Sequence, residues 1–255
     1  MIKKNNANKN NIKISSFIQA RIGSTRLNSK VLKPLGDKRV LDYVLEASFS
    51  VFPEDTILVI PDSKENDILY KEYKNVMNVF RGSENDVLKR FLDCAEHTHT
   101  DFIVRICSDN PFIQKRFIQK IKSAAEKNDC DYISYFIDDI NCITKAFGLY
   151  AEGFSVKKAK ELYEGTDSFQ REHVTPAFYN QKSECKILKL IPPKELLKSL
   201  NIRFTLDNQN DYDLYKLIVK NNPMEYYPYK DLLKIVSSNK DIVNRMKENI
   251  LKGKK

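Results

Sequence analysis

Glycine is scarce in this chain, and its scarcity excludes two common designs of phosphate-binding loop. The 255 residues include only seven glycines, whereas an average composition would supply roughly eighteen. No two of them lie two positions apart, so the dinucleotide-binding fingerprint G-x-G-x-x-G is absent. Gly148 and Gly153 have the spacing of a P-loop, but Phe154 stands where that loop needs its lysine. Any nucleotide site in this chain must therefore use another design.

Long apolar runs and paired cysteines are also missing. No run approaches the roughly 20 apolar residues that cross a bilayer, and the first eleven residues, MIKKNNANKNN, lack the apolar segment of a signal peptide. The five cysteines are odd in number and widely spaced, with no C-x-x-C pair. This pattern argues against a zinc site or a disulfide framework and fits a reducing compartment. We therefore expect a cytoplasmic protein that does not insert into membranes.

The net charge of +9 is concentrated at the two ends of the chain. Three lysines lie in residues 1–11 and three in residues 252–255, and neither segment contains an acidic residue. We expect both segments to be basic tails, the first of them disordered. Between the tails, no basic stripe with interleaved aromatic residues stands out, so the sequence predicts no nucleic-acid partner.

Strand-like and helix-like patterns alternate through the first half of the chain. Short apolar runs predict strands at Lys13–Gln19, Thr56–Ile60, Val76–Phe80, Asp101–Ile106 and Asp131–Phe136. Amphipathic runs between them predict helices at Val40–Val51, Lys64–Tyr73, Glu84–His97 and Arg116–Lys127. Strands that alternate with helices of this length imply crossover connections, so we predict an α/β fold with a mostly parallel central sheet.

The second half is less regular. Its patterns predict strands at Ala146–Phe154, Lys186–Ile191 and Ile202–Leu206. They predict helices at Ser168–Tyr179 (interrupted by Pro176), Asp211–Lys220 and Tyr229–Val236, and a last helix that ends near Leu251. No repeat or flexible linker divides the chain. We therefore predict a single domain over residues 12–251, with a substrate-side lobe around residues 137–200.

Three cations and three hydroxyl groups follow the first predicted strand, within the segment Gln19–Lys30. Gly23 permits a tight turn whose backbone N–H groups can point at one anion. Arg21, Arg26 and Lys30 can close around the same anion, with bidentate contacts from the arginines. Because ligands of open parallel sheets bind at the carboxyl ends of the strands, the pattern indicates a pyrophosphate cradle. A solvated basic loop is the alternative interpretation.

The segment Phe80–Leu88 supports two interpretations. Ser83 can cap the following helix, with Asp86 at the position where a capping box usually has glutamate or glutamine. Alternatively, Arg81, Gly82 and Ser83 form a pocket for a base or a ribose. The residue pattern does not decide between them.

Two carboxylates follow two different predicted strands. Asp109 comes after the strand at Asp101–Ile106, and Asp207 comes after the strand at Ile202–Leu206. Each could cap a helix, but a pair at neighbouring strand ends is what a Mg²⁺ ion between a triphosphate and the protein requires. The pair therefore predicts a magnesium site more strongly than either residue alone.

Five motifs occur in an order that resembles one known family. They are Q-A-R-x-G-S-T-R-L-x-x-K-V-L from Gln19, F-R-G-S-E-x-D-V-L-x-R from Phe80, R-I-x-x-D-x-P from Arg105, R-E-H-V-T-P from Arg171 and R-F-T-L-D from Arg203. The chain resembles the SpsF-like spore-coat-polysaccharide cytidylyltransferases, which are related to the CMP-Kdo synthetases. The likeness runs from about Ile14 to Val219. It implies a three-layer α/β/α sandwich of the GT-A-like nucleotidyltransferase type.

The resemblance also implies roles for individual residues. The matches to the triphosphate loop are Arg21, Gly23, Ser24, Arg26 and Lys30, and Gln19, Ala20 and Arg105 also belong to the nucleotide side. The matches to the segment near the base and ribose are Arg81, Gly82 and Ser83. The matches to the Mg²⁺ ligands are Asp109 and Asp207, which together with Arg21, Arg26 and Lys30 make up the implied catalytic set. The matches to the acceptor side are Gly148, Tyr150, Glu152, Arg171, Glu172 and His173.

The reaction implied by the resemblance is the transfer of CMP from CTP to a sugar acid or sugar phosphate, with release of pyrophosphate and with Mg²⁺ as cofactor. Such a reaction activates the sugar for surface glycan synthesis. Guanine or another base, and an amino-sugar phosphate or polyol phosphate acceptor, stay open. His173 either orients or deprotonates the acceptor or has a structural role. A homodimer is compatible with the sequence.

The chain departs from the family pattern at three places. Asn28-Ser29 replaces the usual Pro-Gly before Lys30, and Ser108-Asp109-Asn110-Pro111 replaces Gly-Asp-Cys-Pro. Tyr150 replaces an acid in the acceptor segment, which affects the identity of the substrate more than the activity.

Two other classes of function compete with this interpretation. A glycosyltransferase of similar fold would need a D-x-D motif at a strand end. The motifs Asp129-x-Asp131 and Asp211-x-Asp213 have the spacing but lie before a predicted strand and at the start of a predicted helix. A non-catalytic nucleotide-binding module is expected to lack one of the two metal acids, and both are present here.

Overall fold

The computed structural model describes residues 12–179, 184–197 and 202–252. The tail predicted at residues 1–11 lies outside the described residues, as do residues 253–255 of the tail predicted at 252–255. Lys252 is the last residue of a helix rather than the start of a tail. No helix in the described ranges is long and apolar enough to cross a membrane.

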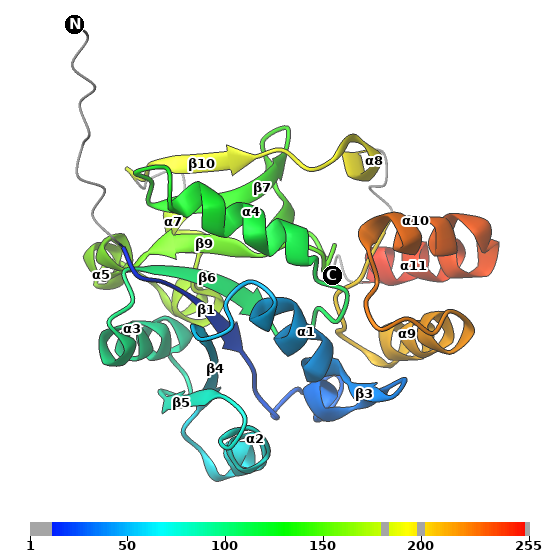
Figure 1. The fold of residues 1–255 in the computed structure, drawn as a ribbon, viewed down its shortest axis with the longest axis horizontal. Coiled ribbons are helices and arrows are strands. Elements are labelled where there is room, and N and C mark those ends of the chain that lie inside the picture. Colours follow the sequence, from blue (N-terminus) through cyan, green and yellow to red (C-terminus); the bar gives the residue numbers. More distant parts are fainter. Residues whose placement is uncertain (1–11, 180–183, 198–201, 253–255) are drawn as a thin grey trace, which may run out of the picture.

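An eight-stranded sheet forms the middle layer of the described structure (Figure 1). Its strands are β1 (Ile14–Gln19), β4 (Thr56–Pro61), β5 (Asn78–Gly82), β6 (Phe102–Cys107), β7 (Tyr132–Ile137), β8 (Ile140–Asn141), β9 (Glu152–Ser155) and β10 (Ile187–Leu190). The order is β10-β7-β9-β6-β1-β4-β5, with β8 beside β7. The neighbours β6, β1, β4 and β5 are parallel, as are β10 and β7. Strand β9 runs antiparallel to both β6 and β7 and joins the two parallel parts.

Helices cover both faces of this sheet. The main covering helices are α1 (Val40–Phe49), α3 (Val87–Thr98), α4 (Lys115–Ala125) and α5 (Val156–Tyr163). Successive side chains of a strand point to opposite faces, and accordingly Ile18 packs in the same core as α1 and α4 whereas Phe17 packs in the core of α3 and α5. The predicted three-layer α/β/α sandwich with a mostly parallel sheet is therefore confirmed.

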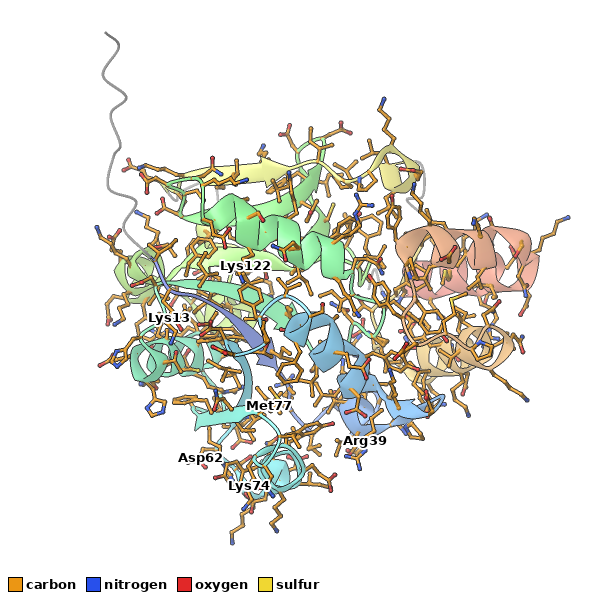
Figure 2. The ribbon with its side chains drawn as sticks, in the orientation of Figure 1. Lys13, Arg39, Asp62, Lys74, Met77 and Lys122 are labelled. Atoms are coloured by element: carbon orange, nitrogen blue, oxygen red, sulfur yellow. The ribbon has the colours of Figure 1, made fainter. Side chains whose placement is uncertain are left out.

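The strands become buried because their sequences are apolar on both faces. All six residues of β4, TILVIP, are buried, which is the pattern of a central strand in a sheet covered by helices on both sides. On the α1 and α4 face, Lys122 of α4 donates to the carbonyl of Val51 at 3.1 Å and lies over the ring of Phe52. This contact ties the end of α4 to the residues that follow α1. Figure 2 labels Lys122 among the side chains beside α4.

Shorter turns, strands and helices complete the described structure, together with the C-terminal helices. They are the turn η1 (Lys30–Leu32), the hairpin β2 (Pro34–Leu35) and β3 (Lys38–Arg39), the turn η2 (Lys64–Asn66), α2 (Asp67–Tyr73), the turn η3 (Cys142–Thr144), α6 (Ser168–His173), α7 (Pro176–Tyr179), α8 (Lys194–Leu197), α9 (Gln209–Asn221), α10 (Tyr229–Ser238) and α11 (Lys240–Lys252). Figure 1 shows α9, α10 and α11 grouped together beside the sheet.

Three predicted elements differ from the structure. The strand predicted at Ala146–Phe154 is limited to β9, and the segment before it is irregular. The strand predicted at Ile202–Leu206 does not form. Its residues are largely buried, but they make isolated backbone bonds, such as Leu206 N–H to the Asp109 carbonyl at 2.8 Å, instead of a strand ladder.

The helix predicted to start at Glu84 starts three residues later. Asp86 is its N-cap, because the Asp86 carboxylate accepts a hydrogen bond from the Lys89 N–H at 2.7 Å. The hydroxyl of Ser83 instead accepts from the Asp86 N–H at 3.2 Å and shapes the turn before the helix. The prediction that Ser83 caps this helix is therefore wrong.

Gly148 provides a test of the fold near the site. Its φ is +66°, and a Cβ added there would lie 2.3 Å from the backbone of Phe204. We predict that Gly148→Ala lowers the free energy of unfolding by at least about 2 kcal/mol, because the backbone is strained and a neighbouring backbone cannot move aside easily. Urea denaturation measures the change.

Gly165→Ala is the matched control, because the nearest heavy atom to its added Cβ is the Leu162 carbonyl oxygen at 3.6 Å. This variant should stay within about 1 kcal/mol of the wild type. Equal stability of the two variants would contradict the close backbone contact at Gly148.

Candidate active site

A cleft of about 280 Å³ lies at the carboxyl ends of β1 and β6 and is closed by α6 on one side and by the residues before α9 on the other. Ten of the predicted site residues line it: Gln19, Arg21, Ser24, Arg26, Lys30, Arg105, Asp109, Glu172, His173 and Asp207. These residues come from four segments that are far apart in the chain. The fold therefore brings together most of the residues that were proposed for the phosphate and metal groups.

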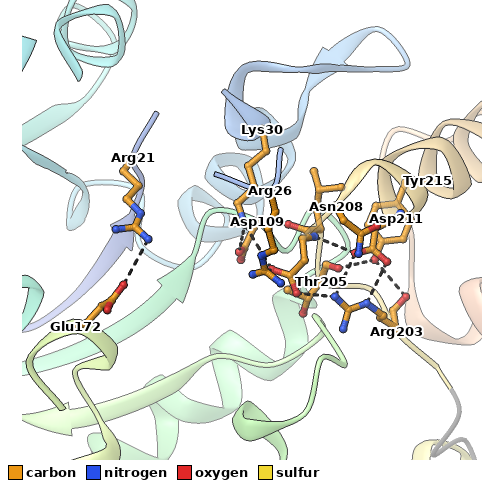
Figure 3. Close-up of polar contacts among 12 residues, drawn as sticks. Arg21, Arg26, Lys30, Asp109, Glu172, Arg203, Thr205, Asn208, Asp211 and Tyr215 are labelled. Carbon is orange, nitrogen blue, oxygen red and sulfur yellow. Dashed lines mark hydrogen bonds and ion pairs between the residues drawn. The ribbon is translucent and has the colours of Figure 1, made fainter. Parts of the chain in front are cut away.

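Lys30 lies at the centre of the cleft, and its side chain is only 14% exposed. Its Nζ donates to Asp109 Oδ2 at 2.7 Å and to the Leu206 carbonyl at 2.9 Å, and it lies 3.7 Å from Asp207 Oδ1 (Figure 3). One ammonium group is thus shared by two carboxylates. The two carboxylates follow different parts of the fold, one after β6 and one before α9, so this contact joins the two walls of the cleft.

Two arginines hold Asp207 from its other sides. Arg26 donates to Asp207 Oδ1 at 2.9 Å, and Arg203 donates to Oδ2 at 2.5 Å. Arg26 is 65% exposed, whereas Arg203 is 6% exposed. The exposed arginine can move to a ligand while the buried arginine keeps the carboxylate in place.

The pair Asp109 and Asp207 has the chemistry of a divalent-cation site. Carboxylate oxygens are hard donors, and Mg²⁺ in nucleotide enzymes is commonly held by one or two carboxylates together with substrate phosphates and water. The Lys30 ammonium already lies within reach of both carboxylates, so their oxygens can share one cation. The described ranges contain no cluster of three or more metal-ligating side chains, so the remaining ligands would have to come from a substrate.

Arg105 forms the floor of the cleft on the β6 side. It donates to Glu152 Oε1 and, at 3.1 Å, to the side-chain oxygen of Gln19. Glu152 is fully buried, and its other oxygen accepts from the hydroxyl of Tyr132. A buried charge is tolerated only when it is paired and hydrogen-bonded, so Glu152 acts from beneath the cleft by fixing Arg105 and does not line the cleft itself.

Helix α6 supplies the opposite rim. Glu172 makes an exposed ion pair with Arg21 at 3.5 Å. His173 stacks on Phe169, with 4.4 Å between the ring centroids. Partial loss of hydration lowers the pKa of His173, and the positive charges of Arg105 and Arg21 lower it further against the opposing effect of Glu172. A neutral imidazole at the rim can accept a proton from a bound hydroxyl group.

Cys107 also lines the cleft, but its thiol is not activated. Burial raises the pKa of Cys107 to about 11. Because the thiolate is the nucleophilic form, a covalent role for this residue at neutral pH has no support in the structure.

The proposed base and ribose segment does not line this cleft. Arg81 pairs with Asp62 at 3.0 Å and with Asp67 at 2.7 Å, next to α2. Beneath Gly82 lies Arg90, which is 1% exposed and donates to the carbonyls of Ser83 at 2.7 Å and Glu84 at 3.0 Å. The loop is thus rigidly supported, but its side chains are engaged within the protein.

Four further predicted residues lie away from the cleft. Tyr150 is 3% exposed and stacks on Phe117 in the core, so its placement on the acceptor wall is wrong. Arg171 lies over the ring of Tyr163 and faces Asp86 at 3.6 Å, on the outer side of α6. Gly148 contacts the backbone of Phe204, and Ala20 is buried at the end of β1.

Gly23 lies beside the cleft-lining loop, but not in the lining itself. A Cβ added to it would contact the carboxylate of Glu65 at 3.2 Å. The turn around it is supported by Asn66, whose side-chain oxygen accepts from the Ile22 N–H at 2.9 Å.

Sequence reasoning assigned no role to several residues that shape the site. Arg203, which holds Asp207, and Arg90, which supports the second loop, both stand inside recognised motifs. The signal for them in the sequence was their position in the motif. Thr25, Val31, Cys107 and Ser108 also line the cleft.

The chain is similar to known proteins over most of its length. A family model described as cytidylyltransferase matches residues 16–242. The chain is 37% identical over 235 residues to the uncharacterized protein MJ1063 of Methanocaldococcus jannaschii. The matched region covers 91% of this chain and 94% of that protein. It is 29% identical over 210 residues to the spore coat polysaccharide biosynthesis protein SpsF of Bacillus subtilis, covering 79% and 84% of the two chains.

Among solved structures, a cytidylyltransferase from Leptospira borgpetersenii superposes with a TM-score of 0.80 at 27% identity. The superposition covers 91% of this chain and 97% of that chain. The likeness thus extends over nearly the whole of both chains.

His173 offers a test of the electrostatics of the cleft. We predict that its proton NMR titration midpoint lies below the usual value of about 6.5, because neighbouring cations and lost hydration disfavour the charged imidazole. Arg21→Met should move the midpoint upward, since it removes one of these cations. A wild-type midpoint at or above about 6.5 would contradict the lowered pKa of His173.

Proposed function

We propose, from the premise that this chain belongs to the cytidylyltransferase family, that it transfers CMP from CTP to a sugar acid or sugar phosphate and releases pyrophosphate. The protein is thus a nucleotidyltransferase, and the proposal concerns its substrates and its chemistry. The observation that carries the proposal is the cluster of Arg21, Arg26 and Lys30 against Asp109 and Asp207 in one cleft.

The three cations suit the pyrophosphate that leaves. Arg21 and Arg26 are exposed at the mouth of the cleft, and Lys30 lies deeper, beside both carboxylates. Arginine binds phosphate oxygens with two parallel N–H bonds, and lysine acts as a compact charge. A bound triphosphate would exchange the present carboxylate partners of these cations for its own oxygens.

Catalysis in this design depends on position and electrostatics. An acceptor oxygen attacks the α-phosphorus of CTP in line with the departing pyrophosphate, the bond to the pyrophosphate breaks, and its negative charge is stabilised by Arg21, Arg26 and Lys30. No covalent enzyme intermediate is needed, which agrees with the protonated state of Cys107. His173 and Glu172 at the opposite rim are placed to hold the acceptor, and His173 can take its proton.

Asp109 and Asp207 would hold Mg²⁺. The ion would supply a positive charge that draws the phosphate oxygens toward the protein and stabilises the charge that develops on them. The role of the chain itself is to present two hard oxygen donors from the two walls and to place the Lys30 ammonium next to them, within reach of the phosphate oxygens.

The acceptor is proposed from the relatives. SpsF of Bacillus subtilis is named for spore coat polysaccharide biosynthesis, and 3-deoxy-manno-octulosonate cytidylyltransferases of two bacteria match about half of this chain. These names suggest a sugar acid or a related sugar phosphate that is activated for a surface glycan. Arg105 provides donors for its acidic group, and Glu172 provides an acceptor for its hydroxyl groups.

A glycosyltransferase is the weaker candidate. Its D-x-D motif should lie at the cleft, but Asp129 is 91% exposed beside Lys186, and Asp211 is buried in an ion pair with Arg203. Neither D-x-D pair contributes to the lining of the cleft.

Pyrophosphate release tests the proposed activity. We expect release with CTP and a sugar acid or sugar phosphate from a panel of acceptors, at rates that exceed those with ATP, GTP or UTP. A coupled phosphate assay measures it for each pair. Absence of release with every nucleotide and acceptor would contradict the proposal.

The two carboxylates can be tested separately. Asp109→Asn and Asp207→Asn should each lower kcat by about 100-fold or more, because each removes one charged donor from the shared cation site. The exposed Asp93 of α3, which pairs with Lys89, provides the control variant Asp93→Asn, which should keep the wild-type rate. Wild-type rates in both cleft variants would remove the metal assignment.

A further inference from the structure

Asp211 lies just outside the cleft, in the first turn of α9, four residues after Asp207. It is 1% exposed and does not line the cleft. The sequence marks it only as part of a misplaced D-x-D pair. Its hydrogen bonds connect it to Asp207 and to Arg203.

All four lone-pair positions of the Asp211 carboxylate have partners. Oδ1 accepts from Arg203 Nε at 3.0 Å and from Asn249 Nδ2 at 2.9 Å. Oδ2 accepts from an Arg203 terminal nitrogen at 3.2 Å and from the Asp207 N–H at 3.0 Å. A carboxylate can accept about four hydrogen bonds in total, so this one is completely used within the protein and has no capacity for a ligand.

The bond to the Asp207 N–H differs from the bond that an ordinary capping box would make. The cap of α9 is Asn208, whose side-chain oxygen accepts from the Asp211 N–H at 3.0 Å. In a capping box the carboxylate at this position would return the bond to the N–H of the cap residue. Here it bonds instead to the residue before the cap, which is Asp207 itself.

Asp211 therefore holds Asp207 in two ways. It fixes the backbone of Asp207 directly, and it fixes the side chain through Arg203, which bonds to both carboxylates (Figure 3). Arg203 itself donates two parallel bonds to Asp211, a geometry that allows little rotation. The Asp207 carboxylate is thus fixed at Oδ2, and Oδ1 is left facing Lys30 and Arg26.

Stability alone does not explain this arrangement. Removing two charges from water is expensive, and replacing a buried ion pair with apolar side chains of similar volume is often neutral or stabilising. An apolar pair could not, however, hold a carboxylate at a set position. Polar partners beyond the metal ligands commonly set ligand orientation.

Asn249 connects the last helix to this network. It lies on α11, is 3% exposed and donates to Asp211 Oδ1. Helix α11 packs on α9, so the final helix of the chain contacts the group that holds Asp207 although none of its residues lines the cleft.

We propose that Asp211 is a positioning residue that sets the Asp207 carboxylate for cation binding through Arg203, and that Asn249 makes this position depend on α11. The proposal rests on the assignment of Asp207 as a metal ligand in the proposed function. It assigns a role in the reaction to two residues that do not contact any substrate.

The test compares Asp211→Asn with Asp213→Asn in the folded protein. Asp213 lies two residues further along α9, is exposed and bonds only to Gln209 among the contacts seen in the structure. Mn²⁺ binding in the presence of CTP is measured by electron paramagnetic resonance, and pyrophosphate release gives kcat and the KM for CTP. For Asp211→Asn we expect Mn²⁺ affinity and kcat to fall by about 10- to 100-fold, with the KM for CTP at saturating metal changed by less than about 3-fold. Asp213→Asn should match the wild type.

Asn249→Ala is the second variant and covers the case in which Asp211→Asn does not fold. It removes one of the four bonds, so we expect a drop of about 3- to 10-fold in Mn²⁺ affinity. Wild-type metal affinity and kcat in a folded Asp211→Asn protein would overturn the proposal, as would an Asn249→Ala protein with wild-type affinity when only that variant folds.

A crystal structure of the variant separates this proposal from the proposed function. If the wild-type protein binds no Mn²⁺ with CTP, the proposed function is contradicted. An Asp207 carboxylate that has moved away from Lys30 in the variant still supports the positioning role, and an unmoved carboxylate overturns it.

Discussion

The contact on which the site depends is the Lys30 ammonium between Asp109 and Asp207. Its three members come from the loop after β1, the end of β6 and the segment before α9, which are brought together by the parallel sheet and by the return of the chain along its carboxyl edge. Each carboxylate is paired with Lys30, so neither charge is left unpaired at a partly buried site. The same arrangement places two hard oxygen donors and a phosphate-binding cation within one cleft.

The charged pairs around this contact differ in how exposed they are. Arg21 and Arg26 are exposed and have weak or exchangeable partners, whereas Arg105 and Arg203 are buried and held by Glu152 and Asp211. The buried pairs hold fixed side chains in the cleft, and the exposed arginines are free to move toward a bound ligand. A site of this kind reorganises little when the charge of the leaving group develops, which is the main source of electrostatic catalysis.

The sequence predicted the layers of the fold and the three loops that build the cleft, because strand periodicity and clustered cations at strand ends are local signals. It did not predict that Tyr150 is in the core, that Glu152 acts from beneath Arg105, or that Asp86 rather than Ser83 caps α3. Each of these depends on packing between segments distant in the chain, such as Tyr150 on Phe117 and Tyr132 on Glu152. Arg203 and Asp211 are only eight residues apart in the chain. Their contact could still not be predicted, because it also depends on Asn249 and on the irregular backbone before α9.

The most direct test of the account is a crystal structure of the protein with CTP and Mg²⁺. The account predicts a metal ion bound by Asp109 and Asp207, and triphosphate oxygens in contact with Lys30 and with at least one of Arg21 and Arg26. A triphosphate bound elsewhere, with Lys30 still bonded to both carboxylates, would contradict the account.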